Sequence, residues 1–212
     1  MANIKYSDLI SEVLPILSAD PSDPVTEHAI KRAVIILCNE SRIWKHIPDA
    51  IDMVAGENAY DLEPPTGAEV ACVTALSLEG VSLDAVSSDW LDKAMPDWHT
   101  AQSHPTCWTQ TDTSQVILAK VPNANISGAI QTTLALQPTS SAAGFPKWIA
   151  TRHIHTIADG ALGYLLMMPQ KGWTDFALGS ARNQAFKDGI SEARLASVSG
   201  LSRARTRTTS QH

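Results

Sequence analysis

The sequence predicts a mainly helical α+β fold, in which a four-helix bundle carries an inserted small antiparallel β region. Two observations lead to this prediction. Apolar residues recur at helical spacing near both ends of the chain, and short β-like runs separated by turn residues fill the middle. Contiguous helix pairs favour a bundle over a parallel α/β arrangement. The expected segments are a helix pair over 1–46, a β-rich insertion over 47–144, a helix pair over 145–199 and an extended, flexible basic tail over 200–212.

The first helix pair is predicted from two apolar stripes. One stripe consists of Tyr6, Ile10, Val13, Leu14 and Leu17. Prolines then interrupt the helical pattern, and Asp23 can cap a second helix whose first residue is Pro24, where a missing N–H costs nothing. That helix should run to about Lys45. Its expected buried side consists of Ile30, Val34, Leu37, Cys38, Ser41 and Trp44.

The middle of the chain is predicted to form a sheet. The β-like runs are 50–54, 58–62, 70–78, 115–120 and 128–136. Turn residues such as Gly56-Glu57-Asn58 separate them. We expect a short helix over 87–98 and an exposed polar loop over 99–113.

Two long helices are predicted to follow. Apolar residues between Ile149 and Leu166 form one face of the first, which ends at the Met168–Gly172 turn. The second begins near Trp173 and buries residues such as Phe186. Beyond residue 200 no apolar periodicity remains, so the tail is expected to be disordered on its own.

Composition favours a globular protein made in a reducing cytoplasm. Hydrophobic residues make up 44% of the 212, which is enough for a core. The three cysteines are Cys38, Cys72 and Cys107, an odd and widely spaced set that cannot form a complete disulfide framework. The N-terminal segment is unlike a signal peptide, and no run of about 18 apolar residues exists. We therefore expect synthesis in the cytoplasm without export, and no membrane partner.

Charge is unevenly distributed along the chain. The formal net charge is −6, yet the last twenty residues hold four arginines and no carboxylate, which leaves −10 for residues 1–192. An acidic body argues against a conventional nucleic-acid-binding domain. Arg203, Arg205 and Arg207 alternate with small residues, so an extended chain would project all three to one side. They could bind phosphate, dock onto an acidic groove of a protein partner, or form an inert terminus; protein docking ranks above DNA binding.

A histidine group is the sharpest catalytic candidate. His155 and Asp159 are four residues apart and could share a helix face as metal ligands or as an acid–base pair. His153 would point to a different face, so both histidines cannot easily hold one ion. Solvated or interface histidines are therefore favoured.

Other catalytic patterns are weaker still. A glycosidase-like pair would need two carboxylates across a cleft, and no spacing selects such a pair. The carboxylates near the first helix pair are Glu27, Glu40 and Asp49. Cys107 lies near His99 and His104 in the polar loop, but proximity along a loop does not make a nucleophile–base dyad. With no P-loop, GxGxxG, GxSxG or HExxH motif, the sequence predicts no catalytic residue, metal site or cofactor.

The six tryptophans are candidates for contact residues. Trp90, Trp98 and Trp108 fall in the predicted loop and short-helix region. If these side chains are exposed, they are possible interface aromatics, and burial in a core is an equal alternative. Trp44 and Trp173 lie at helix ends, where packing is expected.

The order of four segments resembles a known family. These segments are Glu40–Trp44 after the first helix pair, Tyr60–Pro65 before the 70–78 run, Leu136-Gln137-Pro138 followed by Phe145–Trp148, and Ile157–Pro169 followed by Gly172–Asp175. Together they cover nearly the whole chain. In this order the sequence resembles the head-to-tail connector (adaptor) proteins of short-tailed bacteriophages, the tail tubular protein A-like proteins.

The resemblance implies a structural, non-enzymatic role in the virion at the head–tail junction. Family members form rings, of twelve subunits in the better-known cases, whose wall is the helical bundle and whose lumen passes genomic DNA without specific binding. The C-terminal segment would dock on the portal through Arg203, Arg205 and Arg207, and the β region would face the next tail component, a nozzle or tail tube. A virion-associated cell-wall hydrolase and a helical nucleic-acid-binding module are the alternatives.

Overall fold

The computed structural model describes residues 2–199, and the chain divides into two compact units. The helical unit comprises Met1–Trp44 and Gln137–His212, and the β unit comprises Lys45–Leu136. The chain therefore leaves the helical unit once, builds the β unit, and returns.

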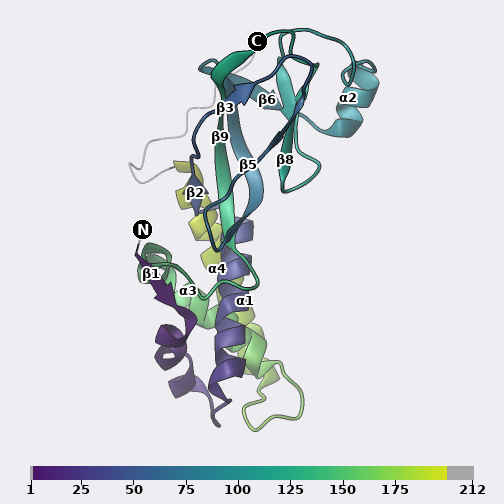
Figure 1. The fold of residues 1–212 in the computed structure, drawn as a ribbon. Coiled ribbons are helices and arrows are strands. Elements are labelled where there is room, and N and C mark those ends of the chain that lie inside the picture. The colour runs from purple at the N-terminus through teal and green to yellow at the C-terminus, as the bar shows by residue number, and fades with distance from the viewer. Residues whose placement is uncertain (1, 200–212) are drawn as a thin grey trace. The chain divides into compact units, whose positions relative to one another are not determined.

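Three long helices form the helical unit: α1 (Asp23–Ser41), α3 (Lys147–Leu166) and α4 (Phe176–Ser199) (Figure 1). Helix α1 has Pro24 in its first turn and ends where Arg42 adopts a left-handed conformation with φ of 55°. The predicted buried side of this helix is confirmed from Ile30 to Ser41, whereas Trp44 lies partly buried against the core.

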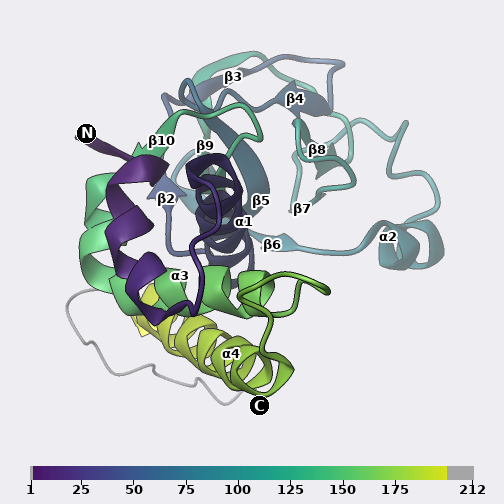
Figure 2. The ribbon, with the colours of Figure 1, turned by 90° about the horizontal axis from the view of Figure 1, so that it is seen from below.

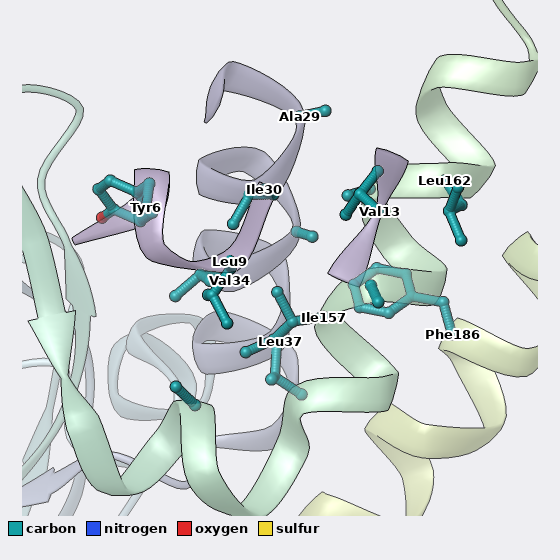
Figure 3. Packing of buried hydrophobic residues seen from close by; sticks show 14 of the residues in the cluster. Tyr6, Leu9, Val13, Ala29, Ile30, Val34, Leu37, Ile157, Leu162 and Phe186 are labelled. Atoms are coloured by element: carbon teal, nitrogen blue, oxygen red, sulfur yellow. The ribbon is translucent and has the colours of Figure 1, made fainter. Parts of the chain in front are cut away.

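The helix expected at the N-terminus is replaced by tighter structure. The segment forms strand β1 (Asn3–Lys5) and two 3-10 helices, η1 (Tyr6–Glu12) and η2 (Leu14–Ile16). Strand β1 pairs antiparallel with β10 (Gly144–Pro146), where a Cβ on Gly144 would collide with the carbonyl of Ile4. Strand pairing fixes the start of the segment, and Pro15 lacks the N–H that an α-helix would need there. The apolar residues are still buried, as Tyr6, Leu9 and Val13 show (Figure 3).

Helices α3 and α4 pack closely over the same core. Phe186 projects from α4 into the cluster that holds Ile157 and Leu162 of α3 (Figure 3). At Gly160 there is no room for a side chain, because a Cβ there would lie 2.9 Å from the Cβ of Ala33 and 2.8 Å from the Phe186 ring. Small residues in α3 therefore set the approach of the three helices.

The β unit is an eight-stranded sheet. Its strands are β2 (Lys45–His46), β3 (Ile51–Met53), β4 (Ala59–Asp61), β5 (Ala68–Leu78), β6 (Val81–Ala85), β7 (Cys107–Thr109), β8 (Gln115–Ala119) and β9 (Ile126–Pro138). The order is β2-β9-β5-β6-β7-β8-β4, and β3 also pairs with β9 (Figure 2). Strands β6 and β7 run parallel, and the short helix α2 (Ser88–Ala94) lies in the connection between them. The sheet therefore begins and ends in short edge strands.

The predicted fold class is wrong. Helices hold 40% of the residues and strands 27%, and the sheet is a large curled layer rather than a small insertion in a four-helix bundle. The N-terminal segment, expected to supply one helix of the bundle, forms two short 3-10 helices instead, so the helical unit has three long helices rather than four. Strands β2, β6 and β7 have two to five residues, too few to show the alternation that marks a strand in sequence. Within residues 2–199, no helix has the length and apolar content to cross a membrane.

Alkaline pH should weaken the helical core through Cys38. Burial raises the pKa of this fully buried thiol to about 12. The unfolded thiol loses its proton from about pH 9, whereas the folded thiol keeps its proton up to about pH 12. Rising pH in this range therefore favours the unfolded state. Each pH unit in that window should remove about 1.4 kcal/mol of stability.

Urea unfolding at pH 8, 9 and 10 measures this effect. Burial, and then Cys38, also raises the pKa of Tyr6, so the wild-type slope contains both groups. Cys38→Ala should flatten the slope above pH 9, and an unchanged slope would exclude the thiol as its source.

Candidate functional site

The predicted histidine group does not assemble into a catalytic site. Asp159 forms an ion pair with Arg182, whose Nη1 donates a hydrogen bond to Oδ1 of Asp159 at 2.8 Å, and this contact joins α3 to α4. His155 is exposed, whereas His153 is half-buried at a kink of α3 with φ of −123° and ψ of 27°. Burial, and then the charge of Arg152, lowers the pKa of His153. Asp159 therefore holds two helices together.

The other catalytic candidates are also separated. Glu27 and Glu40 lie on α1, while Asp49 belongs to the β unit. Cys107 is buried in β7, and the ring of His99 packs instead on Trp98 with centroids 3.5 Å apart. Over residues 2–199, no three His, Cys, Asp or Glu side chains are grouped so that they could hold a metal ion.

Two of the three candidate interface tryptophans are core residues. Trp98 is 2% exposed and Trp108 is 4% exposed. The indole N–H of Trp98 donates to Oδ1 of Asp92 at 2.9 Å, and that of Trp108 donates to the carbonyl of Leu83 at 3.1 Å. Of the two alternatives that the sequence left open for these residues, both therefore follow burial in a core. Trp90 on α2 is 49% exposed and remains a possible contact residue.

The outer surface of α1 is grooved on both sides. One groove of about 490 Å³ runs between α1, α3 and α4, and a second of about 390 Å³ lies on the opposite flank of α1. Arg32 and Ile36 line both grooves. The guanidinium of Arg32 lies over the ring of Tyr164, 4.9 Å from its centroid, and Met167 is 44% exposed beside it. We call the residues Arg32, Ile35, Ile36, Tyr164 and Met167 the α1 surface.

Helix α4 presents a second surface of the helical unit. Among the described residues, four of the 24 in this helix are buried: Gly179, Phe186, Ile190 and Ala193. Leu195 and Val198 near its C-terminal end are 71% and 68% exposed. Apolar side chains this exposed are available for contact with another chain.

The excess of negative over positive charge lies in the β unit. That unit holds twelve Asp and Glu against three Lys and Arg, a net charge of −9. The described residues of the helical unit hold ten of each and are neutral. The acidic body expected from the sequence is therefore a property of one unit.

An acidic groove lies between the two ends of the sheet. It has a volume of about 580 Å³ and is lined by residues 46–51, which connect β2 to β3, and by residues 61–65, which continue from β4. Strands β2 and β4 stand at opposite ends of the strand order, and the sheet curls so that β3, which pairs with β9, lies near β4 (Figure 2). Asp49, Asp61 and Glu63 line the groove, and none of its lining residues within the described chain is Lys or Arg.

Sequence reasoning missed the acidic groove and the α1 surface. The alternation of Asp61 and Glu63 was visible, but only the curled sheet brings Asp49 to the same place. The predicted docking residues Arg203, Arg205 and Arg207 lie outside the described residues.

Comparison with known proteins identifies one family. A model of the SU10 adaptor protein family matches residues 4–211. No curated protein matches the chain. The matched range contains both units, so the β unit is part of the family's domain and not an addition to it.

Proposed function

Because the chain belongs to the SU10 adaptor protein family, and is thus a structural head-to-tail adaptor of a bacteriophage, we propose that it forms a closed ring between portal and tail. The family match over both units is the observation that carries this proposal. Virion rings are built from identical subunits in head-to-tail contact, and we expect about twelve here, as the resemblance implies. The lumen of the ring would continue the DNA channel.

The charge distribution suits a passage for DNA. A wall that grips phosphates would slow DNA that has to move through it. The β unit carries −9 and the described part of the helical unit is neutral, so neither attracts phosphate. DNA passes the ring, in this proposal, without specific binding.

The helical unit is proposed as the ring wall. A head-to-tail ring needs two different surfaces on each subunit, each complementary to the other. The α1 surface and the exposed side of α4, with Leu195 and Val198, are two such surfaces on one unit. We expect the α1 surface of one copy to pack on α4 of the next.

The portal protein and a nozzle or tail-tube protein are the proposed partners. The β unit would face the tail, where the exposed Trp90 offers a large aromatic contact. Arg203, Arg205 and Arg207 are proposed to contact another chain of the assembly, because alternate positions on an extended chain can face one surface.

Mass photometry of the protein with the portal of its own phage tests the proposal. A portal complex that gains about twelve subunits is the expected result, whether or not the free chain is monomeric. Arg32→Glu should reduce the number of bound subunits by placing a carboxylate between two copies. Lys171→Glu is the matched control, since Lys171 is exposed and lies outside both grooves. Absence of any complex across a range of salt concentrations would overturn the adaptor ring.

A further inference from the structure

We infer that the acidic groove of one subunit binds residues 200–212 of a neighbouring copy, so that the ring is linked by exchanged C-terminal segments. The groove and the segment are complementary in charge. Three carboxylates line the groove, and the segment carries three arginines and no Asp or Glu side chain. The inference rests on the proposed ring, because only there does each copy have an identical neighbour at close range.

The groove has carboxylates that are free to accept a partner. Asp49 and Glu63 are exposed and make no hydrogen bond or ion pair within residues 2–199. Asp61 accepts a hydrogen bond from Nε2 of Gln115 at 2.8 Å, which leaves its second oxygen available. Arginine is the side chain whose planar fork matches a carboxylate with two hydrogen bonds. The groove thus offers as many carboxylates as the segment has arginines.

The groove also has apolar walls. Ile47 is 64% exposed, and Ile51, Leu62 and three prolines also line the groove. On an extended chain Leu201 lies on the same side as the three arginines, whereas Ser202, Ala204, Thr206 and Thr208 lie on the other. One face of the segment therefore brings an apolar residue and three positive charges, in keeping with the two kinds of lining.

The segment holds its three arginines within a short span of chain. Thirteen residues follow Ser199, where α4 ends. An extended chain rises about 3.3 Å per residue, so Arg203 and Arg207 would be about 13 Å apart, with Arg205 between them. Pro48, Pro64 and Pro65 have no N–H. We therefore expect ion pairs from side chains to dominate over a continuous added strand.

Peptide binding to the full-length chain provides the first test. The receiver is the Arg203→Ala, Arg205→Ala, Arg207→Ala variant, whose own segment cannot compete, and the probe is a fluorescent peptide of residues 200–212. Fluorescence anisotropy should show binding that weakens as salt rises from 50 to 500 mM. Adding Asp49→Asn and Glu63→Gln to the receiver should weaken it about tenfold.

The matched control neutralises two other carboxylates of the β unit. Glu79→Gln and Asp84→Asn remove the same charge from exposed positions outside the groove. This control should lose much less affinity than the groove variant. Equal loss in both variants, or no binding of the peptide at 50 mM salt, would overturn the inference. If the peptide bound the isolated portal and not this chain, the arginines would be portal-binding residues, and the inference would be wrong.

Mixing two variants tests whether the segment is exchanged. The triple arginine variant keeps an intact groove, and the Asp49→Asn, Glu63→Gln variant keeps an intact segment. If copies exchange segments, the mixture should crosslink between these two chains more than either variant does alone. Crosslinking confined to single chains of the wild type would contradict exchange. If wild-type protein forms the portal complex but shows no exchange of segments, the proposed ring would be supported and only the exchange would be wrong.

Discussion

Trp108→Ala is expected to lower the free energy of unfolding of the β unit by about 3–5 kcal/mol. The side chain is buried in the short strand β7, where it lies opposite Leu118 of β8 and Ala85 of β6. Truncation removes a large buried apolar area, and the carbonyl of Leu83 loses the indole N–H that it accepts. Chemical denaturation measures the loss, and hydrogen exchange by mass spectrometry should locate it in Lys45–Leu136.

Two further variants separate burial from the hydrogen bond. Trp90→Ala removes the same side chain from an exposed position and should cost under about 1 kcal/mol. Trp108→Phe keeps most of the apolar area but loses the donor, so an intermediate cost of about 1–3 kcal/mol is expected. If Trp90→Ala were as destabilising as Trp108→Ala, burial would not be the cause.

Gly160→Ala is expected to destabilise the helical unit by about 1–3 kcal/mol. Helix propensity alone would make alanine about 1 kcal/mol more stable than glycine at this position. We expect destabilisation instead, because the collision of the new Cβ costs more than this gain. The new Cβ would lie 2.9 Å from the Cβ of Ala33 on α1, which has no rotamer that could move away. It would also press on the Phe186 ring of α4 at 2.8 Å. Three helices would have to separate to accept one methyl group.

Thermal and urea unfolding of Gly160→Ala should be compared with Ala181→Ser. Ala181 is exposed on α4, so its replacement should cost under about 1 kcal/mol. Phe186→Leu combined with Gly160→Ala should cost less than the sum of the two single changes, because the smaller side chain relieves the contact. A stabilising Gly160→Ala would show that helix propensity outweighs the collision.

Elements with a strong local pattern could be predicted from the sequence. Helices α1, α3 and α4 each repeat apolar residues over several turns, and β5 and β9 contain long β-like runs. The buried side of α1 was read from residues such as Ile30 and Leu37, because spacing alone places them on one face. The order of such segments along the chain also led to the adaptor family, which the match over residues 4–211 shows.

Other features depend on partners that are distant in sequence. Strand β7 has three residues, and its parallel pairing with β6 makes it part of the sheet. That pairing also places Trp108 in the interior, where the sequence left exposure and burial as equal alternatives. The N-terminal segment has a helical stripe, yet pairing of β1 with β10 and the presence of Pro15 favour 3-10 structure.

The sequence by itself determined the net charge, the three long helices and the family of this protein. Only the tertiary structure decided where the charge lies and which carboxylates meet. Asp49 is twelve residues from Asp61, and the two share a groove because the sheet curls until β3 and β4 approach each other. Periodicity reports which face of an element is buried, since it reflects contacts repeated along that element. It carries no information on which distant strand will pair, and the acidic groove is a product of that pairing.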